Sequence, residues 1–149
     1  SYVVNEQVVV INKANADKFT SLADMDNVSV CAESGSAGES AIEADEHLSK
    51  GKYLGVSAQK DCLLEVKAGT CDAAVLDMTL AKAVINDDTD YSDLMILDGA
   101  SLLSEEYAIG FRLEDVETVK TVNDAIAQLV ANGKLAELGE KYGVDVISK

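Results

Sequence analysis

The chain has 149 residues, and its 27 acidic against 12 basic side chains give a formal net charge of −15 at pH 7. This charge disfavours nucleic acid and anionic membrane surfaces as partners, because both repel an acidic protein. The length fits one domain with a full hydrophobic core. No apolar run approaches the ~20 residues of a membrane span, and no signal segment opens the chain, so we expect that something upstream has been removed.

The first half of the sequence predicts strands alternating with helices. Residues 3–11 form an extended β-branched stretch, followed by a polar turn and a short helical connection. Residues 28–32 predict a buried strand, and the S-x-x-E spacing of Ser36 and Glu39 predicts a capping box that begins a helix over 37–49. A brief strand over 53–56 and a helix over 58–68 follow.

The second half continues this alternation. Residues 71–76 are nearly all apolar, which is typical of a strand covered by helices on both faces. A helix over 78–85 and a polar loop come next. The remaining expected elements are short strands over 94–97 and 107–111 and helices over 116–129 and 135–142. The pattern predicts an α/β fold, a three-layer sandwich in which a mixed sheet has helices on both faces.

Two predicted strand ends carry polar groups of complementary kind. After the first buried strand come Glu33, Ser36 and the backbone N–H groups of Ala37 and Gly38, where a helix N-terminus favours a carboxylate. After the later apolar strand comes Asp77, whose carboxylate favours an ammonium group. Ligands of open α/β sheets bind beyond the carboxyl ends of strands, so the pair indicates a site for a free α-amino acid. The alternatives are ordinary helix caps at Ser36 and at Asp77.

Other candidate residues favour structural roles. Cys31, Cys62 and Cys71 lack metal-ligand spacing and predict buried free thiols, with a Cys62–Cys71 bridge as the alternative. His47 lies on the polar side of its predicted helix and is interpreted as a solvated surface residue rather than a base. The acidic loop 87–90 lacks the glycine and the closing glutamate of a calcium loop, which favours a solvated turn. We therefore expect no enzyme activity, no metal and no cofactor.

Five segments in order resemble the bacterial extracellular solute-binding proteins of the polar amino acid type, which serve ABC importers. The resemblance covers nearly the whole chain and starts partway into the family's sequence. The segments are residues 1–10 (SYVVNEQVVV), similar to the hinge strand that enters the second lobe; 22–25 with 30–42; 68–77 (AGTCDAAVLD); 106–112 (EYAIGFR), similar to the return hinge; and 123–143, similar to the closing helices.

This resemblance implies one lobe of a type II periplasmic-binding-protein fold. The second ligand-binding lobe, with its entering hinge strand, would span residues 1–106. The return hinge strand and the C-terminal helices, which normally pack on the first lobe, would span 107–149. The first lobe, with its carboxylate-clamping arginine, has no counterpart here. Arg112 is the only arginine of the chain and falls in the return hinge, so it is not that residue.

The resemblance also assigns site residues and a function. Ser36 with the amides of Ala37 and Gly38 would hold the ligand carboxylate, Asp77 the α-ammonium, and Glu33 would read the ligand side chain. The chain would then be a fragment of an ABC transporter substrate-binding protein, which captures a free L-amino acid between two lobes and delivers it to a membrane permease. The alternative is the extracellular sensory domain of a receptor with this fold, and an enzyme such as a dehydratase ranks third.

Two further expectations follow from the resemblance. The protein would work outside the cytoplasm, in the periplasm or lipid-anchored at the cell surface. Without the first lobe, an apolar stripe on the C-terminal helices would be exposed, and we expect the chain to form a homodimer through it. The stripe comprises Val119, Val122, Ile126, Leu129, Leu135 and Leu138.

Overall fold

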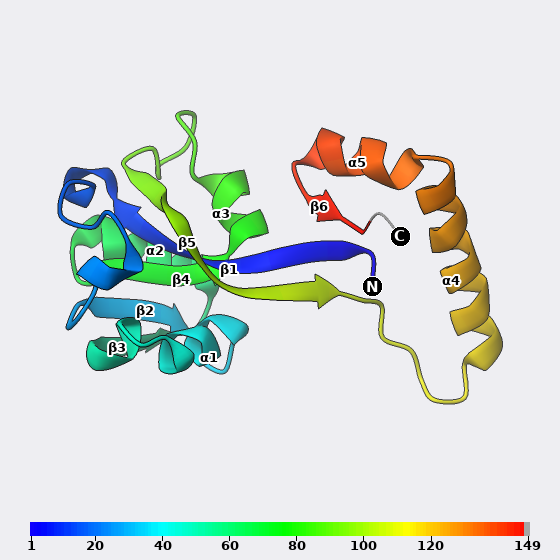
Figure 1. Cartoon of the computed structure of the whole chain (residues 1–149), viewed down its shortest axis with the longest axis horizontal. Helices are drawn as coiled ribbons and strands as arrows, with labels where there is room; N and C mark the ends of the chain where they lie inside the picture. The colour runs from blue at the N-terminus through cyan, green and yellow to red at the C-terminus, as the bar shows by residue number, and fades with distance from the viewer. Residues whose placement is uncertain (148–149) are drawn as a thin grey trace. The chain divides into compact units, whose positions relative to one another are not determined.

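The computed structural model describes residues 1–147, which form two compact units (Figure 1). The larger unit is Glu6–Ser104, and the smaller one joins Ser1–Asn5 to the chain from Glu105 onward. Strands β1 (Val3–Asn12) and β5 (Leu94–Tyr107) each have residues in both units. The first five residues thus lie with the C-terminal helices, and the assignment of 1–106 and 107–149 to two functional parts stays a prediction.

The larger unit alternates strands and helices as the sequence predicts. Strand β2 runs parallel to β3 and to β4, β1 runs antiparallel to β4, and the sheet order is β3-β2-β4-β1-β5. This mixed sheet confirms the α/β class. The other elements of this unit are β2 (Ser29–Glu33), α1 (Ala37–Ala44), β3 (Lys52–Val56), α2 (Gln59–Ala68), β4 (Ala73–Asp77) and α3 (Met78–Val84), with single 3-10 turns at Lys13–Asn15, Leu22–Asp24 and Leu48–Lys50.

Both faces of this sheet are covered, which confirms the three layers. Alternate residues of β1 face opposite sides: Val9 packs in one apolar cluster and Val10 in the other. Helix α1 supplies Ile42 to the first cluster, while α2 supplies Leu63 to the second. Because each strand has an apolar layer on both sides, its sequence is apolar at successive positions rather than at every second one.

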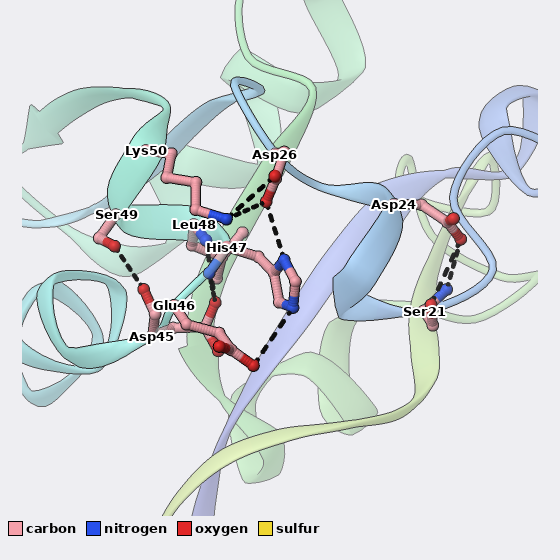
Figure 2. Close-up of polar contacts among 9 residues, drawn as sticks. All are labelled: Ser21, Asp24, Asp26, Asp45, Glu46, His47, Leu48, Ser49 and Lys50. Carbon is pink, nitrogen blue, oxygen red and sulfur yellow. Dashed lines mark hydrogen bonds and ion pairs between the residues drawn. The ribbon is translucent and has the colours of Figure 1, made fainter.

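Helix α1 ends at Ala44, five residues before the expected end at Ser49. Asp45 takes an extended backbone conformation, and its side chain accepts hydrogen bonds from the N–H groups of His47 and Leu48, both at 2.9 Å (Figure 2). Asp45 is the C-cap residue of α1, and its side chain holds the backbone of the next two residues in a turn that leads to the short 3-10 helix at Leu48, whose N-cap residue is His47. The sequence did not predict this break, because its apolar residues keep helical spacing over 37–49.

His47 is not the solvated surface residue that the sequence predicts, since its side chain is only 23% exposed. Its Nδ1 lies 2.8 Å from Oδ1 of Asp26, and the ammonium of Lys50 lies 2.9 Å from the same oxygen (Figure 2). Both hydrogen bonds lower the pKa of Asp26, and the one from Lys50 has the larger effect. The cluster ties the loop before β2 to the turn after α1, which is a structural role.

The two strands expected over 94–97 and 107–111 are wrong in their bounds. A single strand, β5, extends from Leu94 to Tyr107, and residues 108–115 have neither helix nor strand. Gly99, at φ +72°, permits a local bend without ending the strand. Strand β5 is the neighbour of β1 in the sheet, and it continues through residues 101–106, four of which are polar, although the sequence predicts no strand there.

The smaller unit contains α4 (Val116–Ala131), α5 (Lys134–Tyr142) and a two-residue strand, β6 (Asp145–Val146), which the sequence reading missed. Strand β6 pairs antiparallel with the start of β1, with Val3 opposite Val146. In this unit the buried side-chain amide of Asn5 donates to Oε1 of Glu105 at 2.8 Å. No helix within residues 1–147 is both long and apolar enough to cross a bilayer.

The apolar stripe on these helices is less exposed than the sequence predicts. Leu135 is buried, and the other five members are half-buried. The large apolar side chains that do face solvent in this unit are Ile109, Phe111, Leu113, Val116 and Tyr142, and we call the four that lie between residues 109 and 116 the C-terminal patch. Three of them lie in residues 108–115, where we expected a paired hinge strand rather than an exposed connection.

The half-buried carboxylate of Asp72 connects the segments that begin β2 and β4. Asp72 accepts hydrogen bonds at Oδ2 from the backbone N–H and the hydroxyl of Ser29, at 2.9 and 2.8 Å, and Lys18 lies 3.7 Å from Oδ1. Burial alone would raise the pKa of Asp72, but these hydrogen bonds and the lysine outweigh it and lower the pKa. The folded state therefore binds a proton at Asp72 less readily than the unfolded state does.

Replacing Asp72 by asparagine should reduce the free energy of unfolding by about 1 kcal/mol at pH 7. A carboxyl group with a lowered folded pKa stabilises the protein fully above its unfolded pKa of about 3.9 and loses this contribution as the pH falls through the folded value. The difference between parent and variant should thus shrink below about pH 4. Urea unfolding of both proteins at neutral and acidic pH measures it, and a difference that does not change with pH would contradict the assignment.

Candidate functional site

The turn between β2 and α1 has the polar groups expected of it. Ser36 is the N-cap of α1, and its hydroxyl oxygen accepts a hydrogen bond from the N–H of Glu39 at 3.2 Å. This leaves the hydroxyl proton available for donation to a ligand. The N–H groups of Ala37 and Gly38 have no acceptor inside the helix, because the first turn of any helix lacks one. Ser36, Ala37 and Gly38 thus present donors at the positive end of α1.

The expected capping box is only half formed, because the Glu39 carboxylate does not accept from the N–H of the N-cap residue Ser36. The N–H of Ser36 already donates to the carbonyl of Glu33 at 3.2 Å. The carboxylate of Glu39 therefore accepts from the N–H of Gly35 instead, one residue earlier. Gly35 has φ +77°, a conformation that favours glycine and turns this N–H toward α1. Glu39 also lies near Tyr53, whose pKa is raised by burial and by this carboxylate.

Asp77 is held at the end of β4 by two glutamine side chains. Gln7 lies opposite Asp77 in the β1–β4 register, and its Nε2 donates to Oδ1 at 2.5 Å. The Nε2 of Gln59 donates to Oδ2 at 2.8 Å, while its Oε1 accepts from the backbone N–H of Asp77 at 3.0 Å. Asp77 is the N-cap residue of α3, as the alternative reading expected, but its side chain makes no capping hydrogen bond to that helix. Its carboxylate is oriented by the two glutamine amides.

The buried side chain of Gln7 connects the two strand ends. Its Nε2 contacts Asp77, and its Oε1 lies 3.2 Å from the place that a Cβ on Gly38 would occupy. The same Cβ position is 3.0 Å from the carbonyl oxygen of Val75, so a larger residue at 38 would push the start of α1 away from the sheet. The side-chain amide of Gln7 therefore lies between Gly38 and Asp77.

Glu33 lies at the end of β2, as expected, but already makes a structural contact. Its Oε2 accepts a hydrogen bond from the N–H of Gln59 at 3.2 Å. Helix α2 begins at Gln59 after Ala58, which has no side chain to cap it, so Glu33 supplies the missing acceptor. Glu33 and Asp77 are thus joined through one residue, Gln59.

Two residues at this site, Gln7 and Gln59, were missed by the sequence reading. Gln7 could have been noticed in the sequence, because it is a polar side chain that directly precedes the apolar run of β1. Gln59 could not, since a glutamine in the first turn of a helix is ordinary. Among residues 1–147, no group of histidine, cysteine and acidic side chains is arranged to hold a metal ion. The assembled groups suit a ligand that carries a carboxylate and an ammonium close together.

No protein-family model and no curated protein matches this sequence. Solved structures do match. The ancestral amino acid-binding protein AncCDT-1, a precursor of cyclohexadienyl dehydratase, is 25% identical with a TM-score of 0.76, over 95% of this chain and 61% of that one. A mutant of ArgBP from T. maritima is 27% identical with a TM-score of 0.74, again over 95% and 61%.

The fold also matches AbpA from Streptococcus pneumoniae, an amino acid ABC transporter substrate-binding protein solved with L-arginine, at 22% identity and a TM-score of 0.74 over 95% of this chain and 60% of that one. The expected resemblance is therefore confirmed: the chain is similar to amino acid-binding proteins and has the fold of one lobe of a type II periplasmic-binding protein. It spans about 61% of the length of the first two structures.

Proposed function

We propose that the larger unit forms one half of a binding site for a free L-amino acid. In this proposal the ligand carboxylate binds Ser36 and the amides of Ala37 and Gly38, and Asp77 binds the α-ammonium. The observation that supports it is the position of Gln7, which lies between Gly38 and Asp77. The two charged groups of an α-amino acid are attached to the same carbon atom, so donors and an acceptor this close can engage both.

The geometry around Asp77 favours binding for a second reason. A carboxylate already fixed by Gln7 and Gln59 loses little side-chain freedom when a ligand binds, so less of the interaction energy is spent on ordering it. A hydrogen bond between an ammonium and a carboxylate is also among the stronger ones available to proteins. The groups gathered here bind and orient charges, and we propose no chemistry of the chain's own.

The wider role that we propose is delivery of the amino acid to a membrane permease. The protein would act outside the cytoplasm, in the periplasm or as a lipoprotein at the cell surface. The fold shared with AbpA supports this role. A sensory domain of a receptor would use the same half-site, and the full reading frame distinguishes the two: a lipoprotein signal supports transport, whereas a membrane span followed by a kinase supports sensing.

We further propose that Glu33 biases the site toward ligands with a cationic side chain. Its Oε2 already accepts from Gln59, but its negative charge still favours a guanidinium or ammonium over a carboxylate. AbpA, which shares the fold, was solved with L-arginine.

A thermal-shift screen of the twenty amino acids tests both the site and its preference. L-arginine and L-lysine should raise the midpoint most, by about 3–5 °C at ten times the dissociation constant. Glu33→Gln is the matched variant, since its amide oxygen can still accept from the N–H of Gln59 while the charge is gone. The variant should lose the preference for cationic ligands but keep binding. Stabilisation by none of the twenty would overturn the proposed function, and strongest stabilisation by glutamate would overturn only the role of Glu33.

A further inference from the structure

The turn that precedes α1 already holds a carboxylate of the chain itself. The Oε2 of Glu39 accepts a hydrogen bond from the N–H of Gly35, and the backbone N–H of Glu39 donates to the hydroxyl oxygen of Ser36 at 3.2 Å. Both ends of this residue are thus attached to the turn whose free donors are the amides of Ala37 and Gly38. The side chain of Glu39 therefore holds its negative charge beside the positive end of α1.

The charge of Glu39 is not neutralised by a neighbouring cation. Glu39 is half-buried, and no ion pair joins it to a lysine, arginine or histidine side chain within residues 1–147. Glu43, one turn further along the same helix, is exposed, so solvent screens its charge more effectively. An anion that approaches the start of α1 therefore meets the repulsion of one half-buried carboxylate as well as the attraction of the helix dipole.

A carboxylate in the first turn stabilises a helix through the helix dipole, and this accounts for the presence of Glu39 in α1. The same charge also acts on any ligand bound to the amides of Ala37 and Gly38. Because the Coulomb energy is proportional to the charge of the ligand, Glu39 disfavours a dianion about twice as strongly as a monoanion at the same position. A free α-amino acid carries an ammonium beside its carboxylate, so attraction of the ammonium offsets the repulsion.

We propose that Glu39 is a specificity-determining residue, which excludes inorganic dianions and simple carboxylates from the start of α1 but admits a zwitterionic amino acid. Glu39 can act in this way only if the ligand carboxylate binds at Ser36, Ala37 and Gly38, so this role rests on the proposed function. Sulfate and phosphate would otherwise suit a helix N-terminus. A like charge placed against the unwanted ligand is a general source of specificity. Asp77 acts in the same direction, since its carboxylate repels anions and attracts the α-ammonium.

The test is the variant Glu39→Gln, which removes the charge and keeps an amide oxygen that can accept from the N–H of Gly35. Sulfate, acetate and L-alanine are titrated into the parent chain and the variant at a constant ionic strength of ~0.15 M, and the amide NMR signals of residues 35–38 report binding. The variant should bind sulfate about ten-fold more tightly than the parent does. Acetate should gain about three-fold, because its single charge halves the change in free energy, and L-alanine, with no net charge, should change by less than about two-fold.

Glu43→Gln is the matched control, because it removes the same charge one helical turn away, at an exposed position. It should change sulfate binding by less than about two-fold. The comparison of the three ligands separates repulsion from a structural effect. A turn that only loosens in the variant would bind all three ligands more weakly, and a turn that only becomes more accessible would bind all three more tightly by the same factor.

Three results would overturn the role of Glu39: no gain in sulfate binding, equal gains for sulfate and either of the other ligands, or equal gains in the Glu39→Gln and Glu43→Gln variants. Failure of the proposed function is a separate result, in which the parent chain and both variants bind no L-amino acid while the gain for sulfate is still measured. If glutamine destabilises the turn, Glu39→Ala supplies the second test, since it also removes the charge and should give the same order of gains.

Discussion

Replacing Asp77 by asparagine should weaken the binding of a free L-amino acid about 30- to 150-fold, because a charge-assisted hydrogen bond to a buried ammonium is worth ~2–3 kcal/mol. The substitution preserves the size of the side chain and removes its charge. Titration followed by NMR chemical shifts suits the weak binding expected of a single lobe. The variant should show no saturation at ligand concentrations that saturate the parent chain.

Two controls separate this effect from a change in the fold. Asp87→Asn makes the same charge change on the exposed acidic loop and should leave binding unaltered. Asparagine at position 77 also offers one oxygen where Gln7 and Gln59 now donate to two, so some loss of stability is expected. Urea unfolding establishes whether the variant is folded at the temperature of the titration. A folded Asp77→Asn variant with unchanged affinity would remove Asp77 from the site.

The sequence predicted the larger unit well because its local signals agree with its tertiary structure. Successive apolar residues in β1 and β4 predicted strands covered on both faces, and Ser36 predicted the start of α1. The errors have two origins. Strand β5 is longer than expected because it lies beside β1 in the sheet, which is a non-local contact. Helix α1 ends early for a local reason, because the Asp45 side chain accepts hydrogen bonds from the N–H groups of His47 and Leu48.

The candidate site was predictable as residue types but not as a network. Glu33, Ser36, Gly38 and Asp77 follow predicted strands, so their place at one edge of the sheet could be inferred. The part played by Gln7 could not, because it depends on β1 running antiparallel to β4 with Gln7 opposite Asp77. Pairing partners of strands are set by packing far along the chain, and the sequence pattern of one strand does not contain them.

The smaller unit leads to a second prediction with a large expected effect. We infer that the chain forms a two-fold homodimer through the C-terminal patch, in which Leu113 is 98% and Val116 65% exposed. Full burial of a large apolar side chain stabilises a complex by ~1.5–3 kcal/mol, and a two-fold interface buries each such side chain from both protomers. The net charge of −15 opposes association, but charges more than ~8 Å apart are largely screened at physiological salt.

The hydrophobic contribution should therefore prevail, and light scattering coupled to size exclusion in ~0.15 M salt should give twice the chain mass of 15.7 kDa. Leu113→Asp should convert the dimer to a monomer, since each interface would then bury two carboxylates. Leu64→Asp is the matched control, because Leu64 is a 50% exposed leucine on α2 of the larger unit, and the same charge change there should leave the dimer intact. If the parent chain is monomeric at high micromolar concentration, the patch is not a self-association surface. If both variants dissociate equally, added charge rather than the patch controls assembly.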